Sequence, residues 1–396
     1  MTPPMTPPAP APVRRLSLMG IRGLPAAHGG FETFAARLAP WLVAQGWQVT
    51  VYCQEDEIAP LRESLWHGVR RVHIGVGPDT PVNSIVFDWH CIRHAAAERA
   101  PLVLTLGYNT ALFGLWLRLA GITHVINMDG IEWSRRKWGP VARAWLYLNE
   151  WAGALGGSHL VADHPAIATH LATRTAARHI SMIPYGTERV TEADAALLAP
   201  LGLSPGSFCT LIARPEPENS VLEIVRAFSR RPRGCRLVVL GRYEPATVPF
   251  HAAVQAAASD EVLFPGAIYD EATVAALRVH GRFYLHGHQV GGTNPSLLEA
   301  MGAGNAVIAH DNRFNRWVAG AGARYFRDED GCAAAIEALL ADPAEARALG
   351  QANLAAAATR FDWGLILGQY GQTLDALHAR HHGQAARPPL AGRTGA

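Results

Sequence analysis

The sequence predicts an α/β fold made of two doubly wound, Rossmann-like domains that face each other across a cleft. Short runs rich in apolar and β-branched residues alternate with helical patterns along the chain, which favours parallel sheets covered by helices. The alternation falls into two series, separated by an irregular stretch that follows residue 186. A length of 396 residues is large for one core and suits two domains.

The first series is expected to form an N-terminal domain over residues 13–186. Residues 1–12, which precede it, are proline-rich and are expected to be a disordered leader, because they contain neither a basic region nor an apolar core. Helical patterns cover stretches such as residues 31–44 and 83–99. The expected strands are residues 15–19, 48–53, 69–74, 102–106, 124–127, 159–162 and 180–183.

The second series is expected to form a C-terminal domain over residues 187–361. An amphipathic run at about residues 362–380 predicts a last helix. Residues 381–396, rich in His, Arg, Gly and Pro, are expected to be a flexible tail. The expected strands are residues 208–213, 236–240, 261–264, 282–285, 306–309 and 324–326.

Composition excludes several classes of protein. Apolar residues make up 49% of the chain and charged residues 17%, which is typical of a globular protein. The most apolar stretch, residues 111–126, is interrupted by Arg118 and His124, which argues against a spanning helix. The five cysteines are dispersed without a C-x-x-C pair, so we expect a reduced, cytoplasmic chain. The mildly basic first half is compatible with peripheral contact with an anionic membrane and too weak for nucleic-acid binding.

The strongest local signal lies in residues 286–304, which read HGHQVGGTNPSLLEAMGAG. Asn294 can cap a helix and Pro295 suits its first position, so the free N–H groups of the first turn can bind an anion. Glu299 follows on the second turn, where a carboxylate can accept hydrogen bonds from two ribose hydroxyls; a solvated helix glutamate is the alternative. The segment therefore predicts a nucleoside diphosphate site that includes Gly292, Thr293 and Asn294.

A glycine-rich loop, residues 20–30, follows the first expected strand and precedes a helix. Its glycines permit close approach of a phosphate or sugar to backbone N–H groups, and Arg22 adds positive charge. We expect Arg22, Gly29 and Gly30 to contact the ligand. A tight structural turn without a ligand is the alternative.

Arginine is expected to supply the positive side-chain charge for the diphosphate, because Lys137 is the only lysine in the protein. Arg214 directly follows an expected strand and is a candidate phosphate contact; a surface ion pair with Glu216 or Glu218 is the alternative. Arg242 stands at the end of the next strand and is the leading second cation.

Residues 129–138, which read DGIEWSRRKW, follow another expected strand. Acidic groups beside aromatic rings can orient sugar hydroxyls, so Asp129 and Glu132 are candidates for acceptor binding or proton handling. An ion pair with Arg135 or Arg136 is the alternative. The next helix carries aromatic residues that belong either to the core or to a membrane interface: Trp138, Trp145, Tyr147 and Trp151.

The segment around Glu299 resembles the donor-binding segment of family 4 of the retaining glycosyltransferases, in which two glutamates are separated by seven residues and the second precedes Ala-Met. Three further segments resemble a subgroup whose N-terminal domain was long catalogued as of unknown function and which includes bacterial rhamnosyltransferases. They are residues 20–33 (GIRGLPAAHGGFET), 129–133 (DGIEW) and 183–186 (IPYG). The resemblance implies the two-domain GT-B architecture, with the last helix crossing back to the first domain.

This sequence departs from the family pattern at two positions. The first glutamate, near the transferred sugar in the family, is replaced by Gly291. The lysine that usually stands five residues after the arginine of the phosphate grip is replaced by Asn219. Arg214, Arg242 and the helix N-terminus are therefore expected to stabilise the leaving diphosphate.

The resemblance implies a glycosyltransferase that retains anomeric configuration, with a nucleotide diphosphate sugar as donor substrate and no cofactor. L-rhamnose from dTDP-rhamnose is the first choice. The acceptor is expected to be a saccharide or a lipid-linked saccharide at the cytoplasmic membrane face, in cell-surface polysaccharide synthesis. A nucleotide-sugar 2-epimerase of the same architecture and an inactive sugar-nucleotide-binding protein are the alternatives.

No metal is expected at the site. The acidic triplet at residues 328–330 has the D-x-D form of metal-dependent transferases, but a solvated acidic turn is the preferred interpretation. His286 and His288 either line the sugar subsite, with His286 a catalytic candidate beside Asp129, Glu132 and Arg214, or bond to backbone carbonyls. No second ligand pair at a recognised spacing supports zinc.

Overall fold

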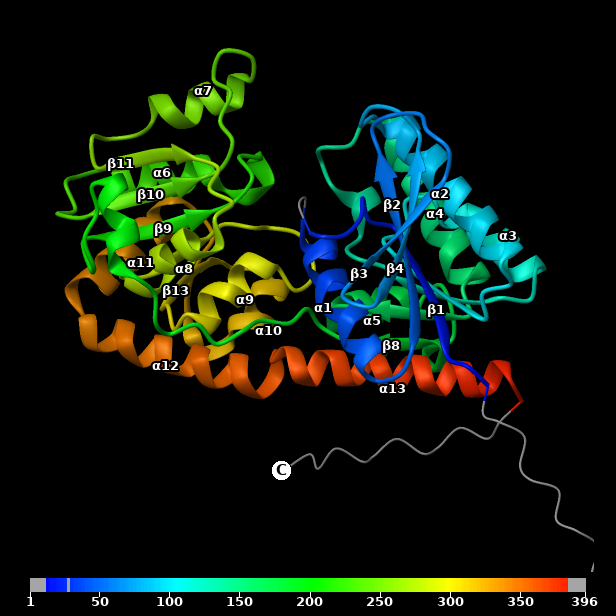
Figure 1. Cartoon of the computed structure of the whole chain (residues 1–396). Coiled ribbons are helices and arrows are strands. Elements are labelled where there is room, and N and C mark those ends of the chain that lie inside the picture. The colour runs from blue at the N-terminus through cyan, green and yellow to red at the C-terminus, as the bar shows by residue number, and fades with distance from the viewer. Residues whose placement is uncertain (1–11, 27–28, 384–396) are drawn as a thin grey trace, which may run out of the picture.

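The computed structural model describes residues 12–26 and 29–383, which form two α/β domains side by side (Figure 1). The leader and tail expected at residues 1–12 and 381–396 lie outside the described residues, apart from Pro12 and residues 381–383. No helix within the described ranges is long and apolar enough to cross a bilayer.

The N-terminal domain contains an eight-stranded sheet in the order β3-β4-β2-β1-β5-β6-β7-β8. Every pairing is parallel except that of β3 with β4. The central strands have side chains in cores on both faces, as buried parallel strands require. The strands are β1 (Arg15–Met19), β2 (Gln48–Glu55), β3 (Arg62–Trp66), β4 (Val69–Gly75), β5 (Leu102–Leu106), β6 (Thr123–Asn127), β7 (His159–Ala162) and β8 (Ile180–Met182).

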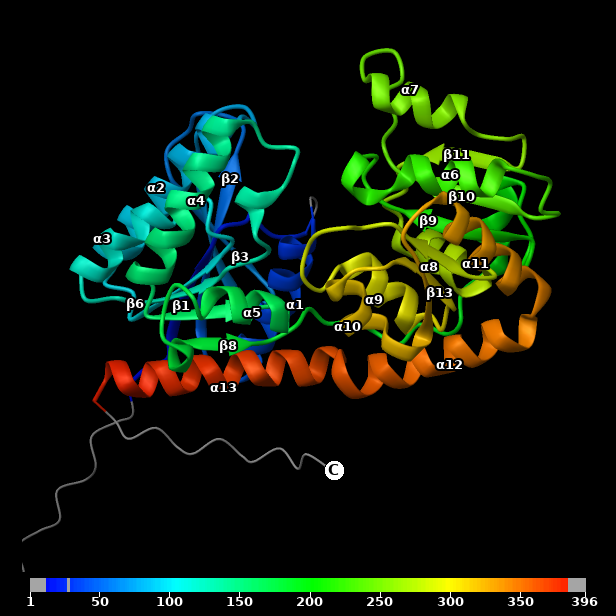
Figure 2. The same cartoon turned by 180° about the vertical axis from the view of Figure 1, so that it is seen from behind.

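Helices cover both faces of this sheet. One face packs against α1 (Gly30–Ala44), and the other packs against α2 (Pro81–Ala97), α3 (Gly114–Leu119), α4 (Pro140–Gly156) and α5 (Pro165–Leu171). Helices α2 and α3 lie on the outer side of the molecule, away from the second domain (Figure 2).

The C-terminal domain contains a parallel six-stranded sheet in the order β11-β10-β9-β12-β13-β14. Its strands are β9 (Phe208–Ile212), β10 (Arg236–Leu240), β11 (Val262–Gly266), β12 (Tyr284–His286), β13 (Val307–His310) and β14 (Ala323–Phe326). Its helices are α6 (Val221–Ser229), α7 (Pro249–Ala256), α8 (Glu271–His280), α9 (Pro295–Gly302), α10 (Arg313–Ala319), α11 (Glu329–Ala341) and α12 (Pro343–Arg360).

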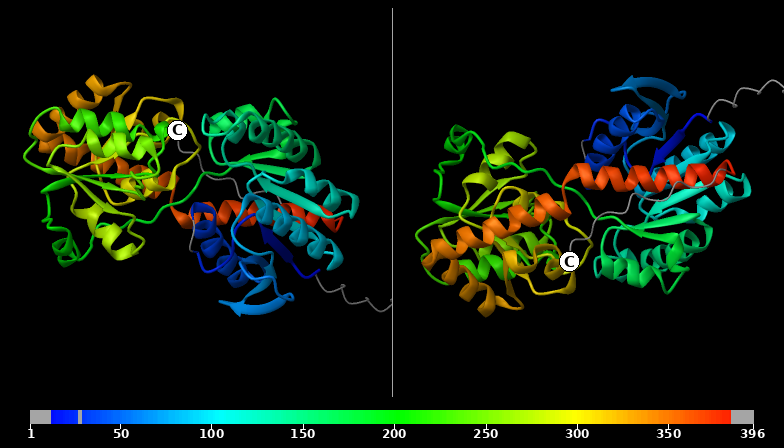
Figure 3. Two further views of the ribbon diagram at one scale, coloured as in Figure 1. Left: turned by 90° about the horizontal axis from the view of Figure 1, so that it is seen from above. Right: turned by 90° about the horizontal axis from the view of Figure 1, so that it is seen from below.

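The last helix, α13 (Trp363–His381), returns to the N-terminal domain. Its apolar side chains join the core under α1, where the rings of Phe34 and Tyr370 lie 4.7 Å apart. Figure 3 shows α12 and α13 running beneath both domains. The chain therefore crosses between the domains near residues 183–187 and again near residue 362, and the predicted α/β class with two doubly wound domains is confirmed.

Strand β3 was not expected from the sequence. It pairs antiparallel with β4 at the sheet edge, where Leu65 is 72% exposed. An exposed, charged edge strand lacks the apolar run that is typical of a buried strand, so no hydrophobic pattern predicted β3.

Candidate functional site

A cavity of about 810 Å³ lies between the domains, at the carboxyl ends of both parallel sheets. This is where open α/β sheets bind ligands, and the volume is in the range of small-molecule sites. Its lining comes from loops after β6, β7 and β8 in the first domain and after β9, β10, β11 and β12 in the second. Predicted site residues in the lining are Gly30, Asp129, Glu132, Arg214, Arg242, Gly292, Thr293 and Asn294.

The predicted helix start is α9. Asn294 is its N-cap and accepts a hydrogen bond from the backbone N–H of Ser296 at 3.0 Å, and Pro295 is the first helical residue. Thr293 is buried, and its hydroxyl accepts a hydrogen bond from the backbone N–H of Tyr185 at 2.8 Å. The positive end of the α9 dipole therefore faces a cavity wall that the first domain helps to hold in place.

The two predicted glycine loops meet at this point. Gly30 begins α1, and a Cβ atom there would lie 3.2 Å from the ring of Pro295. The Tyr185 hydroxyl donates a hydrogen bond to the carbonyl of Gly30 at 3.0 Å. Gly29 is exposed beside this contact and is not part of the cavity wall.

Arg214 and Arg242 lie on the C-terminal side of the cavity. Their side chains are 68% and 81% exposed, and each is beside one glutamate, Glu216 at 3.8 Å and Glu244 at 2.8 Å. Exposed ion pairs of this kind contribute little to stability, so both guanidinium groups can leave their glutamates and bind a phosphate. Asn219 is buried and donates from its amide to the Arg214 carbonyl at 2.8 Å, so it shapes this loop.

Asp129 and Glu132 lie in the loop that follows β6. Burial, with a smaller contribution from Glu132, raises the pKa of Asp129 to about 6. Glu132 accepts a hydrogen bond from Arg135 at 2.8 Å, as the ion-pair alternative predicted. Arg135 also reaches across the cleft to Glu218, a contact the sequence did not predict. Asp129 remains the carboxyl group of this loop without a cationic partner, as far as the structure describes the chain.

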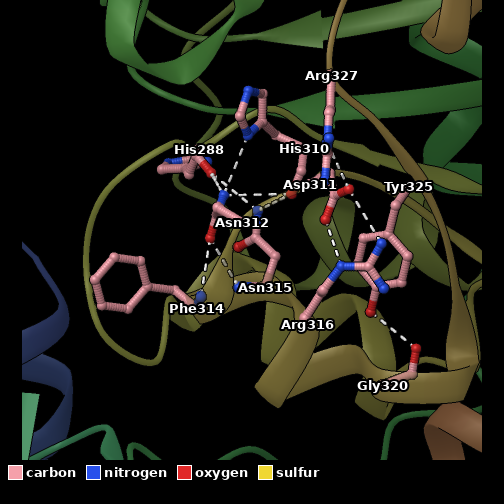
Figure 4. A network of polar contacts seen from close by, with 10 residues as sticks. All are labelled: His288, His310, Asp311, Asn312, Phe314, Asn315, Arg316, Gly320, Tyr325 and Arg327. Carbon is pink, nitrogen blue, oxygen red and sulfur yellow. Dashed lines mark hydrogen bonds and ion pairs between the residues drawn. The ribbon is translucent and has the colours of Figure 1, made fainter. Parts of the chain in front are cut away.

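His288 and His251 both line the cavity, and His288 is the one predicted from the sequence. Its carbonyl accepts hydrogen bonds from the side-chain amides of Asn312 at 3.0 Å and Asn315 at 2.9 Å, so the start of α10 fixes this turn (Figure 4). Burial, followed by the charges of Arg214 and Arg135, lowers the pKa of His288 to about 3. The imidazole of His288 is therefore neutral beside Arg214 and Arg135.

Besides Gly29, three predicted contacts lie outside the cavity wall: His286, Arg22 and Glu299. His286 is fully buried behind His288, with the rings stacked at 4.4 Å, and of these two histidines only His288 lines the cavity. Arg22 pairs with Asp79 at 2.7 Å and Asp56 at 3.1 Å, and lines a separate pocket of about 510 Å³. Two acidic neighbours therefore hold its charge away from the interdomain cavity.

Glu299 also lies outside the cavity wall. Its carboxylate bonds to Arg278 of α8 at 2.5 Å, and its side chain is 40% exposed. A ribose contact would therefore require Glu299 to share its carboxylate with Arg278 or to turn away from it.

Asp163 and Tyr185 are site residues that the sequence reasoning missed. Asp163 directly follows β7 and lines the cavity, bonded to the loop before α9. Its signal was present, because a polar residue at the carboxyl end of a parallel strand belongs to the ligand edge of the sheet.

The acidic triplet has structural roles. Asp328 caps α11 by accepting a hydrogen bond from Gly331 at 2.8 Å, and Asp330 pairs with Arg230 at 2.5 Å. None of the three residues lines the cavity. Across residues 12–26 and 29–383 there is no group of three His, Cys, Asp or Glu side chains arranged to hold a metal ion.

Family models match both halves of the chain. One described as "Domain of unknown function (DUF1972)" matches residues 13–188, and one described as "Glycosyl transferase-like" matches residues 222–369. No curated protein matches the sequence significantly.

Solved structures resemble more than nine-tenths of the chain. Sucrose-phosphate synthase from Thermosynechococcus elongatus is 21% identical with a TM-score of 0.79, covering 93% of this chain and 100% of that chain. HepE from Anabaena, in complex with UDP and glucose, is 14% identical with a TM-score of 0.71, covering 91% and 99%. An α,α-trehalose-phosphate synthase (UDP-forming) from Burkholderia vietnamiensis is 12% identical with a TM-score of 0.70, covering 91% and 99%. These likenesses confirm the predicted GT-B fold and, with the C-terminal family match, support a glycosyltransferase.

Proposed function

We propose that the protein transfers a sugar from a nucleotide diphosphate donor to a hydroxyl group, with L-rhamnose from dTDP-rhamnose as the first choice of donor. One observation carries the proposal: a single interdomain cavity is lined by the N-terminus of α9, Gly30 and the two exposed arginines, Arg214 and Arg242. Helix N-termini and arginines are the groups that bind a diphosphate. The choice of rhamnose rests on the resemblance of residues 20–33, 129–133 and 183–186.

The diphosphate is both the anchor and the leaving group in this proposal. Arg214, Arg242 and the α9 dipole stabilise the negative charge that develops on it as the glycosidic bond breaks. The leaving oxygen can take the proton of the attacking hydroxyl, which corresponds to transfer with retention and without a metal. Asp129 and Glu132 lie at the acceptor side, where Asp129 can accept a hydrogen bond from the acceptor hydroxyl.

We also propose that the acceptor is lipid-linked and that the N-terminal domain lies against an anionic membrane at its cytoplasmic face. Of the aromatic residues expected at such a surface, Trp145 bonds to the Asn109 carbonyl, whereas Trp138 and Tyr147 are 37% and 39% exposed. The outer helical face of α3 and α4 exposes four apolar side chains to a greater extent: Trp116 at 49%, Leu119 at 83%, Leu148 at 62% and Leu155 at 60%.

Charge supports an anionic lipid surface as the partner of this outer helical face. Arg93, Arg118 and Arg143 are exposed on α2, α3 and α4. The two acids of these helices are engaged, Asp88 by the Thr110 hydroxyl and Glu150 by burial and Arg174. Apolar side chains ringed by arginine are typical of a protein that binds anionic lipid.

A thermal-shift panel tests the donor class. UDP, GDP, dTDP and their sugars are each added to the protein, because a ligand that binds only the folded state raises the apparent stability. We expect a shift with one nucleoside diphosphate and a further difference with its sugar conjugate. The matching sugar nucleotide is then incubated with and without membrane-extracted lipid acceptors. Conversion of the donor without any acceptor would indicate an epimerase and contradict the proposal.

A further inference from the structure

Asp163 connects the two domains at the N-terminus of α9. It belongs to the loop after β7 in the N-terminal domain. Its Oδ2 accepts a hydrogen bond from the backbone N–H of Thr293 at 2.8 Å and one from the Thr293 hydroxyl at 3.2 Å. A carboxylate from one domain is thus held in a fixed orientation beside the candidate donor-binding loop of the other.

The loop leaves room for this carboxylate. A Cβ atom at Gly292 would lie 1.9 Å from Oδ1 and 2.1 Å from Oδ2 of Asp163, so only glycine fits there. Gly291 has a φ of +125°, a conformation that side-chain-bearing residues rarely adopt, and open space beside it. The loop therefore disfavours a side chain at Gly291 or Gly292. The space beside Gly292 is taken by the carboxylate of Asp163.

The second carboxylate oxygen of Asp163 has an unmet hydrogen-bonding capacity. Oδ1 is buried and has no hydrogen-bond donor among the described residues. Burial first, and then the charge of Asp129, raise the pKa of Asp163 to about 7. A buried acceptor without a donor is costly, and a ligand hydroxyl is a group that can satisfy it.

Resting on the proposed function, we propose that Asp163 binds a hydroxyl of the donor's transferred sugar and so contributes to sugar specificity. The diphosphate lies at the first turn of α9, and the sugar is bonded directly to it. Asp163 lines the same cavity. It is bonded to Thr293, the residue that precedes Asn294, the cap of that turn. Asp163 thereby supplies, from the N-terminal domain, a carboxylate in place of the glutamate that Gly291 replaces.

Three variants test this assignment by equilibrium titration. The ligands are dTDP and dTDP-L-rhamnose, or whichever diphosphate and sugar pair gives the largest thermal shift. Asp163→Asn removes the charge while its amide oxygen can still accept from Thr293, and Asp163→Ala removes both contacts. Gly292→Ala keeps the acid but displaces it, because the new Cβ occupies its position.

We expect each variant to weaken binding of the sugar nucleotide about tenfold or more and binding of the diphosphate less than about twofold, because the lost contact is to the sugar. Asp88→Asn is the control, since Asp88 is also held in the N-terminal domain with a raised pKa of about 6 but lies outside this cavity. It should change neither affinity.

Equal losses for both ligands would show that Asp163 only positions the loop and would overturn the assignment. Unchanged affinities, or tighter diphosphate binding in Asp163→Ala, would also overturn it, the latter because the carboxylate would then only repel the anion. If the wild type binds no member of any pair, the proposed function itself is wrong.

Discussion

Arg135 and Glu218 form an ion pair across the interdomain cleft, with Nε of Arg135 2.7 Å from Oε1 of Glu218. The side chains are only 14% and 8% exposed. Arg135 also contacts Glu132 at 2.8 Å and Glu216 at 3.5 Å, so its charge is shared among three carboxylates from the two domains. The pair therefore fixes the relative position of the loops after β6 and β9, which carry Asp129 and Arg214.

We expect Glu218→Gln to lower the free energy of unfolding by about 2 kcal/mol, the usual cost of losing a charged hydrogen bond, because Arg135 keeps Glu132 and Glu216 as partners. Urea unfolding measures this. Glu329→Gln, which removes a partner of the exposed Arg226, is the control and should cost less than about 1 kcal/mol. Equal losses in the two variants would show that the cleft pair is screened by solvent and does not hold the domains.

Arg214→Ala should weaken nucleoside diphosphate binding much more than nucleoside binding, because in the proposed complex its guanidinium contacts phosphate only. The expected loss is about 1.5–3 kcal/mol, or roughly 10- to 100-fold. Arg231→Ala is the control, because Arg231 is an exposed arginine of the same domain that pairs with Glu337 at 2.7 Å. Equal losses for the nucleoside and its diphosphate would mean that Arg214 shapes the pocket without contacting phosphate.

Glu299→Ala should weaken nucleotide affinity by roughly 10- to 100-fold if its carboxylate binds the ribose. The ion pair with Arg278 provides an internal control, because Arg278→Ala breaks the same pair and leaves the carboxylate available. Titration of the two folded variants separates the roles. Unchanged affinity in Glu299→Ala, or equal losses in both, would indicate a purely structural glutamate.

Transfer should continue at close to the full rate in EDTA. Arginines and a helix N-terminus supply the positive charge in the proposed site, and among the described residues its carboxylates do not belong to any group of three ligands arranged to hold a metal ion. Asp328→Ala should cost about 1 kcal/mol of stability through the lost α11 cap without slowing transfer. An enzyme silenced by EDTA, rescued by manganese or magnesium, and inactivated by Asp328→Ala with Asp330→Ala would contradict the metal-free mechanism.

The outer helical face should bind vesicles that contain phosphatidylglycerol, and binding should weaken as salt is added, because part of it is electrostatic. Trp116→Glu with Leu119→Glu should reduce co-sedimentation severalfold. Leu365→Glu is the control, an exposed apolar position on α13 with 47% exposure. The same result in both variants, or no binding by the wild type, would remove the membrane from the proposal.

Periodicity predicted most of the fold because both sheets are parallel and buried, so their strands are short apolar runs between helices. It also located the α9 start, where Asn294 and Pro295 act by local chemistry that needs no tertiary context. Edge strand β3 was missed because an exposed strand carries no such run.

The side-chain partners could not be predicted in the same way. Arg22 and Glu299 were expected to meet the ligand, yet each is paired with a residue far away in sequence, Arg22 with Asp79 and Glu299 with Arg278. Asp163 could be placed at the carboxyl end of a strand from the sequence, but its contact with Gly292 could not. That contact forms only when the two domains meet, over a long separation in the chain.

The central claim is that one nucleotide diphosphate binds in the interdomain cavity. Calorimetric titration with the diphosphate selected by the thermal-shift panel tests it most directly, using the wild type and the Arg214→Ala, Arg242→Ala double variant. We predict one site per chain in the wild type and a loss of affinity of roughly 100-fold or more in the double variant, as two charged contacts are removed. No measurable binding of UDP, GDP or dTDP to the folded wild type, or equal binding to the double variant, would contradict the account.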